Sequence, residues 1–259
     1  MRPTSKADDW LALLLYGADL LLKPAPAKIL ESYESWDYRR GLGRHLRRLQ
    51  QRQLLQSSWR SEGRTFQLTD RGRLHALGGR DPVDLWQRPW DGQWRMLLFD
   101  LPTRRQATRV KLIRWLRQHQ FGYLQHSVWI HPDPVPPLRE MLKEWAGDAE
   151  TVTVMEAACA PGYSDAAIVG GAWDFEEINI RYEGYVHVAA KAPQIQRKPG
   201  GSPARLGAWL RQERAAWLHA VILDPLLPQA LLPPGYLGQR AAAVRQETLA
   251  RAQQFMLQL

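Results

Sequence analysis

The sequence has 259 residues, of which 45% are hydrophobic, so its length allows two or three compact domains and its composition excludes general disorder. Its 35 lysines and arginines outnumber 26 acidic residues and give a net charge of +9. This charge favours a polyanionic partner such as nucleic acid, although many soluble enzymes are equally basic.

The first region of the chain, residues 7–77, has the pattern of a small DNA-binding domain. Hydrophobic residues recur at helical spacing in three segments, and two short strands and a closing helix follow. Asp37 is the predicted N-cap of the third helix, and Asp70 is that of the closing helix. Three helices followed by a hairpin are typical of a winged helix-turn-helix domain. The predicted helices span residues 7–23, 27–33, 38–55 and 70–77, and the predicted strands span residues 56–60 and 65–69.

Positive charge is concentrated in the second half of this region. Between Asp37 and Arg73 lie ten arginines and three acidic residues, so this short stretch holds most of the net charge of +9. Within the third helix, Leu42, Leu46 and Leu49 recur at helical spacing, which predicts that they turn toward the domain core. The sequence therefore predicts a cationic outer face on the third helix, a feature that is also typical of a merely solvated helix.

A helix with arginines on its outer face fits the major groove of DNA, where the guanidinium fork can read guanine. Gly43 would let the helix backbone approach DNA closely. Arg60 and Arg64 flank the predicted hairpin tip, from which they can reach phosphates or the minor groove. The predicted DNA-binding residues are Tyr38, Arg39, Arg40, Gly43, Arg44, Arg47, Arg60 and Arg64.

The second region, residues 91–160, alternates between strand and helix patterns, and it leaves room for a further short strand near Gly122. The order strand, helix, strand, helix, strand is typical of a small ferredoxin-like sheet with helices on one face. The predicted strands span residues 93–101, 124–131 and 151–158, and the predicted helices span residues 104–120 and 138–145.

The third region, residues 172–259, is predicted to be mostly helical. A loop rich in glycine and proline at 198–203 and a proline-rich turn at 225–234 separate its helices. The predicted helices span residues 173–191, 205–222 and 238–257.

Other signals restrict the class of protein. Cys159 is the only cysteine, which excludes an intrachain disulfide and a metal site built on cysteines and is typical of the reducing cytoplasm. The seven histidines show no ligand spacing and no phosphate-binding loop occurs, so we expect neither a metal nor a cofactor. The most apolar run, 11–22, contains Asp19 and is too short to span a bilayer. With no signal-peptide pattern, we expect a cytoplasmic protein without a membrane segment.

Aromatic and proline-rich motifs follow one another over residues 89–240. They are Pro89-Trp-Asp-Gly-Gln-Trp94, Leu98-Phe-Asp-Leu-Pro102, Phe121-Gly-Tyr123, Ser127-Val-Trp-Ile130, Ala172-Trp-Asp-Phe175 with Tyr182, Asp224-Pro-Leu-Leu-Pro228 and Leu231-Leu-Pro-Pro234. In these motifs and their order the chain resembles the PaaX-type repressors of phenylacetic acid degradation. The N-terminal region fits that family by position and pattern more than by motif.

The resemblance implies an α+β chain and a homodimer that represses transcription by binding double-stranded operator DNA. It also implies a small effector that releases the DNA, such as phenylacetyl-CoA or another acyl-CoA or aromatic metabolite. Its central domain would be like the small CRISPR adaptation nuclease. The expected domains are a winged helix-turn-helix at 1–80, a linker at 81–90, a ferredoxin-like dimerisation domain at 91–165 and a helical C-terminal domain at 166–259.

An acyl-CoA effector needs a pocket with aromatic faces and cationic partners for its phosphates. Residues of the C-terminal region can supply both, although core packing is the alternative for each aromatic side chain. The candidate effector-binding residues are Trp173, Arg181, Tyr182, Arg205 and Trp217.

Two other functions remain open at the level of the sequence. Asp100 ends the first strand of the central region, where the related nucleases place a metal-binding aspartate across a dimer axis. A metal-dependent nuclease is therefore the alternative, although an aspartate at this place is also typical of a strand end. A third hypothesis is a protein-interaction module whose basic face binds an acidic partner. The operator, the regulated genes, the effector and the sign of regulation are not encoded in any motif.

Overall fold

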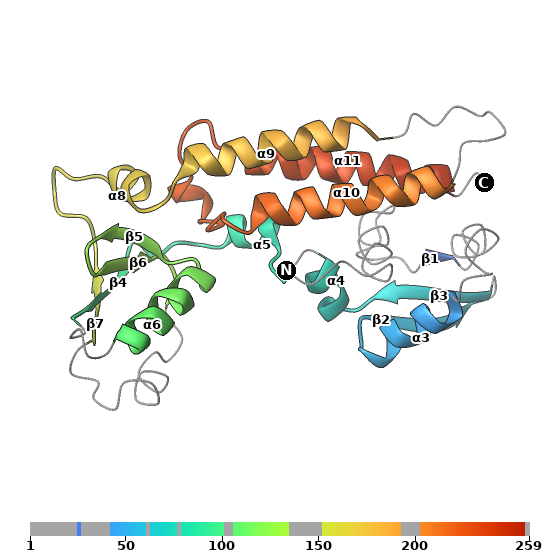
Figure 1. The fold of residues 1–259 in the computed structure, drawn as a ribbon, viewed down its shortest axis with the longest axis horizontal. Coiled ribbons are helices and arrows are strands. Elements are labelled where there is room, and N and C mark those ends of the chain that lie inside the picture. Colours follow the sequence, from blue (N-terminus) through green and yellow to red (C-terminus); the bar gives the residue numbers. More distant parts are fainter. Residues whose placement is uncertain are drawn as a thin grey trace. The chain divides into compact units, whose positions relative to one another are not determined.

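The computed structural model describes residues 25–26, 42–60, 63–76, 79–100, 106–134, 152–192 and 203–256, with the elements labelled in Figure 1. The chain divides into two compact units that each combine distant segments of the sequence. The first unit comprises residues 1–82, 180–222 and 237–259, and the second comprises residues 83–179 and 223–236. None of the described helices combines the length and the apolar character that crossing a bilayer requires.

In the first unit, a three-stranded antiparallel sheet is flanked in the sequence by two helices. Its strand order is β1-β3-β2, so the long hairpin is joined by a very short strand from upstream. Helix α3 precedes the hairpin and helix α4 follows it, as the sequence predicts for 38–77. The elements are β1 (Ala25–Pro26), α3 (Leu42–Gln51), β2 (Leu55–Arg60), β3 (Gly63–Leu68) and α4 (Asp70–Ala76). The expected helices at 7–23 and 27–33, and the Asp37 cap, lie outside the described residues.

The prediction that the third helix continues to residue 55 is wrong, because α3 ends at Gln51. The amide of Leu54 donates to the carbonyl of Leu49 at 2.9 Å, and the amide of Gln53 donates to that of Gln50 at 2.8 Å. With Gln53 at φ 58, these bonds form a Schellman motif, which turns the chain out of a helix. Leu49 and Leu54, each 1% exposed, provide the hydrophobic contact that accompanies the motif.

We expect Gln53→Gly to stabilise the first unit. A left-handed conformation costs a residue with a Cβ about 1–2 kcal/mol, and the larger unfolded-state entropy of glycine returns about half of that. The net gain is therefore about 0.5–1 kcal/mol in the protection of the α3 amides against native-state hydrogen exchange. The matched control is Gln51→Gly, which places glycine at the last residue of the helix, where no left-handed conformation is needed, and which should lower that protection. A loss of protection in Gln53→Gly would contradict the assigned helix end.

The cap of α4 also differs from the expectation. Thr69, rather than Asp70, is the capping residue, since its Oγ1 accepts a hydrogen bond from the amide of Gly72 at 3.0 Å. Asp70 instead lies in the first turn of the helix, where a negative charge interacts favourably with the helix dipole.

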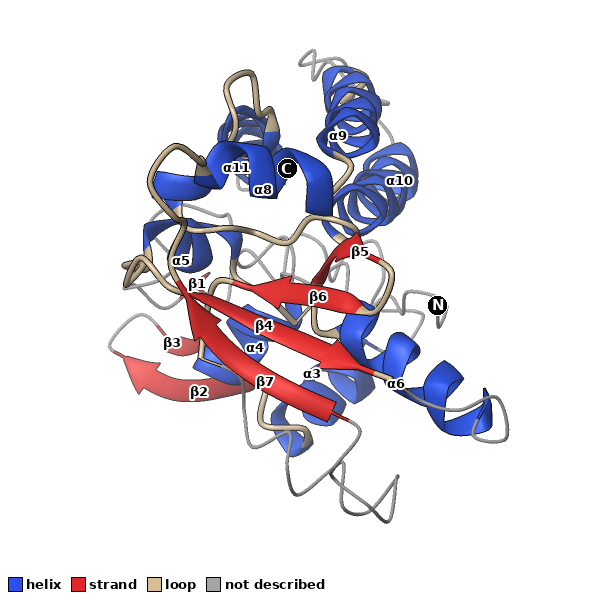
Figure 2. Cartoon of the chain, turned by 90° about the vertical axis from the view of Figure 1, so that its left-hand side faces the viewer, coloured by secondary structure: helices blue, strands red, loops and turns tan. Residues whose placement is uncertain are grey.

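The second unit contains a four-stranded antiparallel sheet with the order β5-β6-β4-β7 (Figure 2). Together with the helix that follows β4, this order is that of a ferredoxin-like sheet, as the sequence predicts. The second helix of that pattern, expected at 138–145, lies outside the described residues. The elements are β4 (Trp94–Phe99), α6 (Gln106–Gln118), β5 (Gly122–Gln125), β6 (Val128–His131) and β7 (Val152–Ala157).

Alternate residues of β4 bury side chains on opposite faces of this sheet. Leu97 and Phe99 pack with Leu112 and Leu116 of α6. Trp94 belongs to a separate cluster on the other face, which contains Ile130, Val169, Ala172, Leu227 and Leu231. Both faces of the central strand are therefore covered, which explains its nearly unbroken apolar sequence.

The single strand expected over 124–131 is in fact the hairpin of β5 and β6. The chain turns at His126, which has φ 47, and the strand near Gly122 is thereby confirmed. Gly122 packs closely on residues 172–173, since a Cβ there would lie 2.7 Å from the ring of Trp173 and 2.8 Å from the Cβ of Ala172. A glycine is therefore required at this position.

The sequence predictions missed helix α8 (Asp165–Ala172). The Ser164 hydroxyl caps it by accepting a hydrogen bond from the amide of Ala167. Trp173 is extended and separates α8 from α9 (Phe175–Ala190), so the helix expected from residue 173 begins two residues later. The carboxylate of Asp174 accepts from the amide of Glu177 at 2.9 Å at the start of α9.

Two further long helices, α10 (Pro203–Val221) and α11 (Gly238–Met256), agree closely with the predicted ones. Charged side chains are buried in these helices beside aromatic ones: Glu213 and Arg245 are both 0% exposed, and Trp217 is 1% exposed.

The expected linker at 81–90 contains the short helix α5 (Pro82–Gln87). The segment 166–259, expected as one helical domain, is divided between the two compact units, so the three-domain organisation stays a prediction.

Candidate nucleic-acid interface

Helix α3 presents a cationic surface at its C-terminal half. Arg47 and Arg48 are exposed, whereas Leu49 is buried, so the helix has the inward and outward faces that the sequence predicts at these positions. Arg52, just beyond the helix end, is exposed as well. Because α3 carries no acidic residue, its field is positive along its whole length.

The hairpin brings two of the predicted arginines to its outer end. Strands β2 and β3 are paired from Leu55 opposite Leu68 to Arg60 opposite Gly63. Arg64 is the residue after Gly63 and lies opposite Trp59. The two arginines therefore lie on the last backbone pairs before the tip, where the wing of a winged helix contacts DNA beside the major groove.

A small set of hydrogen bonds and one close backbone contact fix α3 relative to the hairpin and α4. The amide of Thr69 donates to the carbonyl of Leu54 at 3.2 Å, and the Thr69 hydroxyl donates to the carbonyl of Gln53 at 2.6 Å. Gly72 packs directly on this junction, because a Cβ at that position would lie 2.0 Å from the Leu54 oxygen. The end of α3 is thus held at the base of the hairpin, which orients the helix before any ligand binds.

The other predicted DNA-binding residues fall partly beyond the described residues. Tyr38, Arg39 and Arg40 lie outside them. Gly43 and Arg44 lie on α3, one turn before Arg47. Sequence reasoning omitted Arg48 and Arg52, although a helical-wheel count from Leu49 would have placed Arg48 away from the core.

The candidate effector residues do not form one cluster within a single unit. Trp173 belongs to the second unit, where its Nε1 donates to the carbonyl of Gln120 at 3.2 Å. Tyr182 and Trp217, 0% and 1% exposed, pack together in the first unit with ring centroids 6.0 Å apart. The remaining two candidates, Arg181 on α9 and Arg205 on α10, also belong to the first unit. Arg181 donates a hydrogen bond to the carbonyl of His219 at 3.3 Å.

Asp100, the residue of the nuclease alternative, follows β4 directly and is exposed. Within the described parts of the chain no group of three or more histidine, cysteine, aspartate or glutamate side chains is arranged to hold a metal ion.

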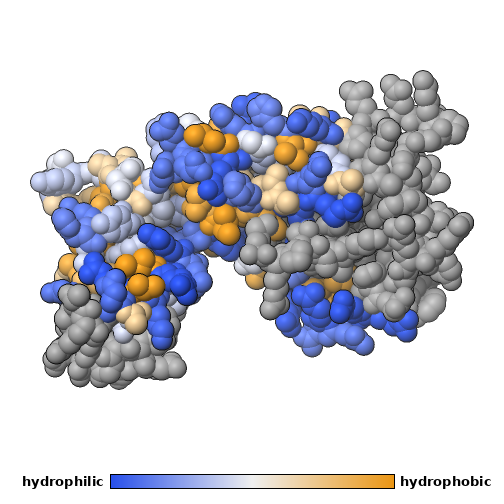
Figure 3. Space-filling view, viewed as in Figure 1, coloured by the Kyte–Doolittle hydropathy of each residue, from blue (hydrophilic) through white to orange (hydrophobic). Residues whose placement is uncertain are grey.

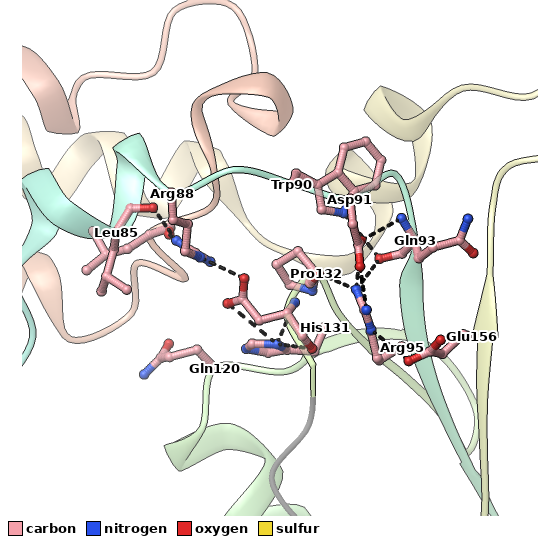
Figure 4. Close-up of polar contacts among 12 residues, drawn as sticks. Leu85, Arg88, Trp90, Asp91, Gln93, Arg95, Gln120, His131, Pro132 and Glu156 are labelled. Atoms are coloured by element: carbon pink, nitrogen blue, oxygen red, sulfur yellow. Dashed lines mark hydrogen bonds and ion pairs between the residues drawn. The ribbon is translucent and has the colours of Figure 1, made fainter.

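The motif at 89–94 supports a polar network at the start of β4, drawn in Figure 4. Arg95 is 6% exposed and donates to Asp91 and to the carbonyl of Pro132, the latter at 3.0 Å, and its Nε lies 3.3 Å from a carboxylate oxygen of Glu156. The hydrogen bond from Arg95 lowers the pKa of Asp91 below its ordinary value, and the same bond raises the pKa of Arg95. This network orients the connection into the sheet.

Arg88 makes a second anchor nearby. Its Nε donates to Asp133 at 2.7 Å, and its terminal nitrogen donates to the carbonyls of Leu85 and Leu226. The segment after α5 is thereby tied to the loop after β6 and to the segment 223–236.

Two family models match the chain. The model of the PaaX protein central Cas2-like domain matches residues 87–169, and the model of the PaaX-like protein C-terminal domain matches residues 173–257. The transcriptional repressor PaaX of Escherichia coli (strain K12) is 25% identical over 189 residues, which are 68% of this chain and 57% of that repressor. The chain thus spans little more than half of that relative's length.

Among solved structures, the uncharacterized protein Rv0674 from Mycobacterium tuberculosis is similar, with a TM-score of 0.59 and 21% sequence identity. The similarity covers 96% of this chain and 97% of that one. At this level of identity it concerns the fold alone. The residues before 87, which include α3 and the hairpin, lie outside both family models.

Proposed function

Because this chain belongs to the PaaX family, we propose that it is a transcriptional repressor that binds double-stranded operator DNA through α3 and the β2–β3 hairpin. The observation that carries the proposal is the set of exposed arginines on α3, a helix that directly precedes a hairpin with arginines at its tip. The E. coli relative, whose name states that it is a transcriptional repressor, supports the same role.

The winged helix-turn-helix assignment of the N-terminal region is part of this proposal. A short strand, a recognition helix and a two-stranded wing in the sheet order β1-β3-β2 support it. In that arrangement α3 enters the major groove and its arginines read base edges, while Arg60 and Arg64 contact the adjacent backbone. The base contacts give sequence specificity and the phosphate contacts give register.

The active form is a homodimer, because a two-fold symmetric pair of α3 helices matches a palindromic operator. Its half-sites then lie about 34–36 Å, or a multiple of that distance, apart along the DNA. A small acyl-CoA or aromatic effector favours a dimer geometry that no longer fits this spacing, and so releases the DNA.

A footprint on the DNA upstream of the protein's own operon tests the function. We expect protection of one palindromic site, with an affinity that falls steeply as salt rises. Addition of CoA thioesters from a panel of short and aromatic acids should abolish the protection, whereas free CoA should not. Absence of any sequence-specific protection at low salt would overturn the proposal. Mg²⁺-dependent cleavage of the DNA that disappears in Asp100→Asn would replace it with the nuclease alternative.

A further inference from the structure

The outer face of α6 carries a second cationic surface, far in the sequence from α3. Lys111, Arg114 and Arg117 are all exposed, whereas Leu112 and Leu116 on the inner face are 1% and 0% exposed. At 100° per residue, Arg114 points directly away from the two leucines, and Lys111 and Arg117 lie to either side of it. We call these three residues the α6 ridge.

The segment that carries the α6 ridge is basic, whereas the rest of the second unit is acidic. Residues 104–117 contain six arginines and lysines and no acidic residue. The rest of the second unit contains four basic residues against fourteen acidic ones. A surface that serves only solubility usually mixes charges of both signs, and this segregation is therefore unlike a general solvated surface.

The three side chains are not used for internal contacts in the described part of the protein. No carboxylate there lies within 4.0 Å of any of the three. Arg109, on the same helix, shows the contrast, because its guanidinium lies over the ring of Phe99, 5.8 Å from the centroid. Figure 3 shows a mostly hydrophilic surface over α6 around a small hydrophobic area.

We propose that the α6 ridge binds the phosphate backbone of DNA and extends the contact beyond the base-reading element. This inference rests on the proposed function, since it assumes that the ligand of α3 is duplex DNA. The chemistry is that of point charges against phosphates, which needs no base contact and carries no sequence preference. Three cations spaced at i, i+3 and i+6 cover about 9 Å of helix, which suits neighbouring phosphates of one strand.

The test is the triple variant Lys111→Gln/Arg114→Gln/Arg117→Gln, measured on operator DNA and on a random-sequence duplex of equal length. If each ridge cation neutralises one phosphate, the slope of log Kobs against log salt should be smaller than in the wild type by about 2.7 per protomer. Between about 50 and 200 mM salt, this difference corresponds to about fortyfold more affinity lost by the wild type for each protomer that contacts the DNA. Both DNA molecules should show the same change, because phosphate contacts do not depend on sequence.

The matched control is Lys191→Gln/Arg211→Gln/Arg240→Gln, which removes the same charge from exposed positions in the first unit. It should leave the slope close to that of the wild type. Equal slopes for the ridge variant, the control and the wild type would overturn the inference while leaving the repressor function intact. A ridge variant that binds DNA normally but loses its response to CoA thioesters would also overturn it, in favour of a small anionic ligand. Sequence-independent binding that depends on the ridge, with no operator preference, would instead sustain the inference and refute the repressor function.

Discussion

Replacing Arg44 and Arg47 of α3 with alanine is expected to lower the affinity for operator DNA by at least about thirtyfold, with little change in folding. Each arginine that contacts a guanine through its fork contributes about 1–3 kcal/mol of discrimination, so the pair contributes about 2–6 kcal/mol. Arg47 is exposed and Arg44 precedes it by one turn, so removing them leaves the buried Leu49 side of the helix unchanged.

The measurement is the ratio of affinity for the operator to that for random-sequence DNA. Because base contacts carry the specificity, we expect this ratio to fall in the α3 variant. Neutralising the α6 ridge should lower both affinities together and leave the ratio almost unchanged. The control Arg211→Ala/Arg240→Ala removes two exposed arginines from α10 and α11 and should change neither quantity. An unchanged ratio in a folded Arg44→Ala/Arg47→Ala variant would show that α3 is not the reading element.

The sequence predicts the β2–β3 hairpin, α3 and α4 well because their hydrophobic spacing is unambiguous, whereas the two-residue strand β1 was not expected. The segments of α3, β2, β3 and α4 were each expected near their observed positions, because alternation and helical spacing change clearly at their borders. The end of α3 was expected four residues late. Gln53 adopts a left-handed conformation, which at helix ends is usually taken by glycine. Because a glutamine stands at this position, no local sequence signal marks the end of α3.

Two elements of the second unit depend on tertiary packing rather than on local sequence. Helix α8 contains Gly170 and Gly171, which weaken a helix, and it lacks an amphipathic pattern. It forms because Val169 and Ala172 are buried against Trp94 and Ile130 of the sheet. The turn at His126 was missed for a related reason, since it has no glycine or proline at its centre.

The candidate interface could be predicted only in part from the sequence, because the exposure of a side chain depends on where its helix ends. Net charge and the leucine spacing identify the helix and its outward side, and the exposure of Arg47 agrees with this. A helical-wheel count alone would have found Arg48, whereas Arg52 needed the observed helix end, because the expected longer helix placed it within a continuous amphipathic pattern. The basic character of α6 is visible in the sequence, but the absence of a carboxylate within 4.0 Å of the ridge, among the residues that the structure describes, needed the folded unit.

The largest expected effect on stability comes from the buried ion pair of Glu213 and Arg245 in the first unit. Both side chains are 0% exposed, and Arg245 Nε donates to Glu213 Oε1 at 2.8 Å. The same oxygen accepts a hydrogen bond from the Tyr185 hydroxyl at 3.0 Å. The guanidinium carbon of Arg245 also lies 4.6 Å from the centroid of the Trp217 ring. Helices α9, α10 and α11 therefore meet at one charged centre.

We expect Arg245→Met to lower the free energy of unfolding by about 3–5 kcal/mol, because it leaves the Glu213 carboxylate buried without its cation. Glu213→Leu should cost at least as much, since a guanidinium cannot lose its charge whereas a carboxylate can take up a proton. The double variant Glu213→Leu/Arg245→Met should recover most of the loss, because removing both charges also removes the desolvation cost. Thermal unfolding measures the effect, and the single variants should melt roughly 10 °C or more below the wild type.

The control for this pair is Arg240→Met, which replaces an exposed arginine on the same helix and should shift the melting temperature very little. If the double variant melts at as low a temperature as the single variants, the two side chains stabilise the unit by packing and not by neutralising each other's buried charge. In that case Trp217 and Tyr185, which contact the pair, hold the three helices together instead. Recovery in the double variant would mean that the ion pair adds little net stability, and its role would then be to keep the helices in a single register, which is the best-attested role of buried polar pairs. That role would matter for the proposed repressor, because a proposed effector could switch it only between discrete arrangements of its helices.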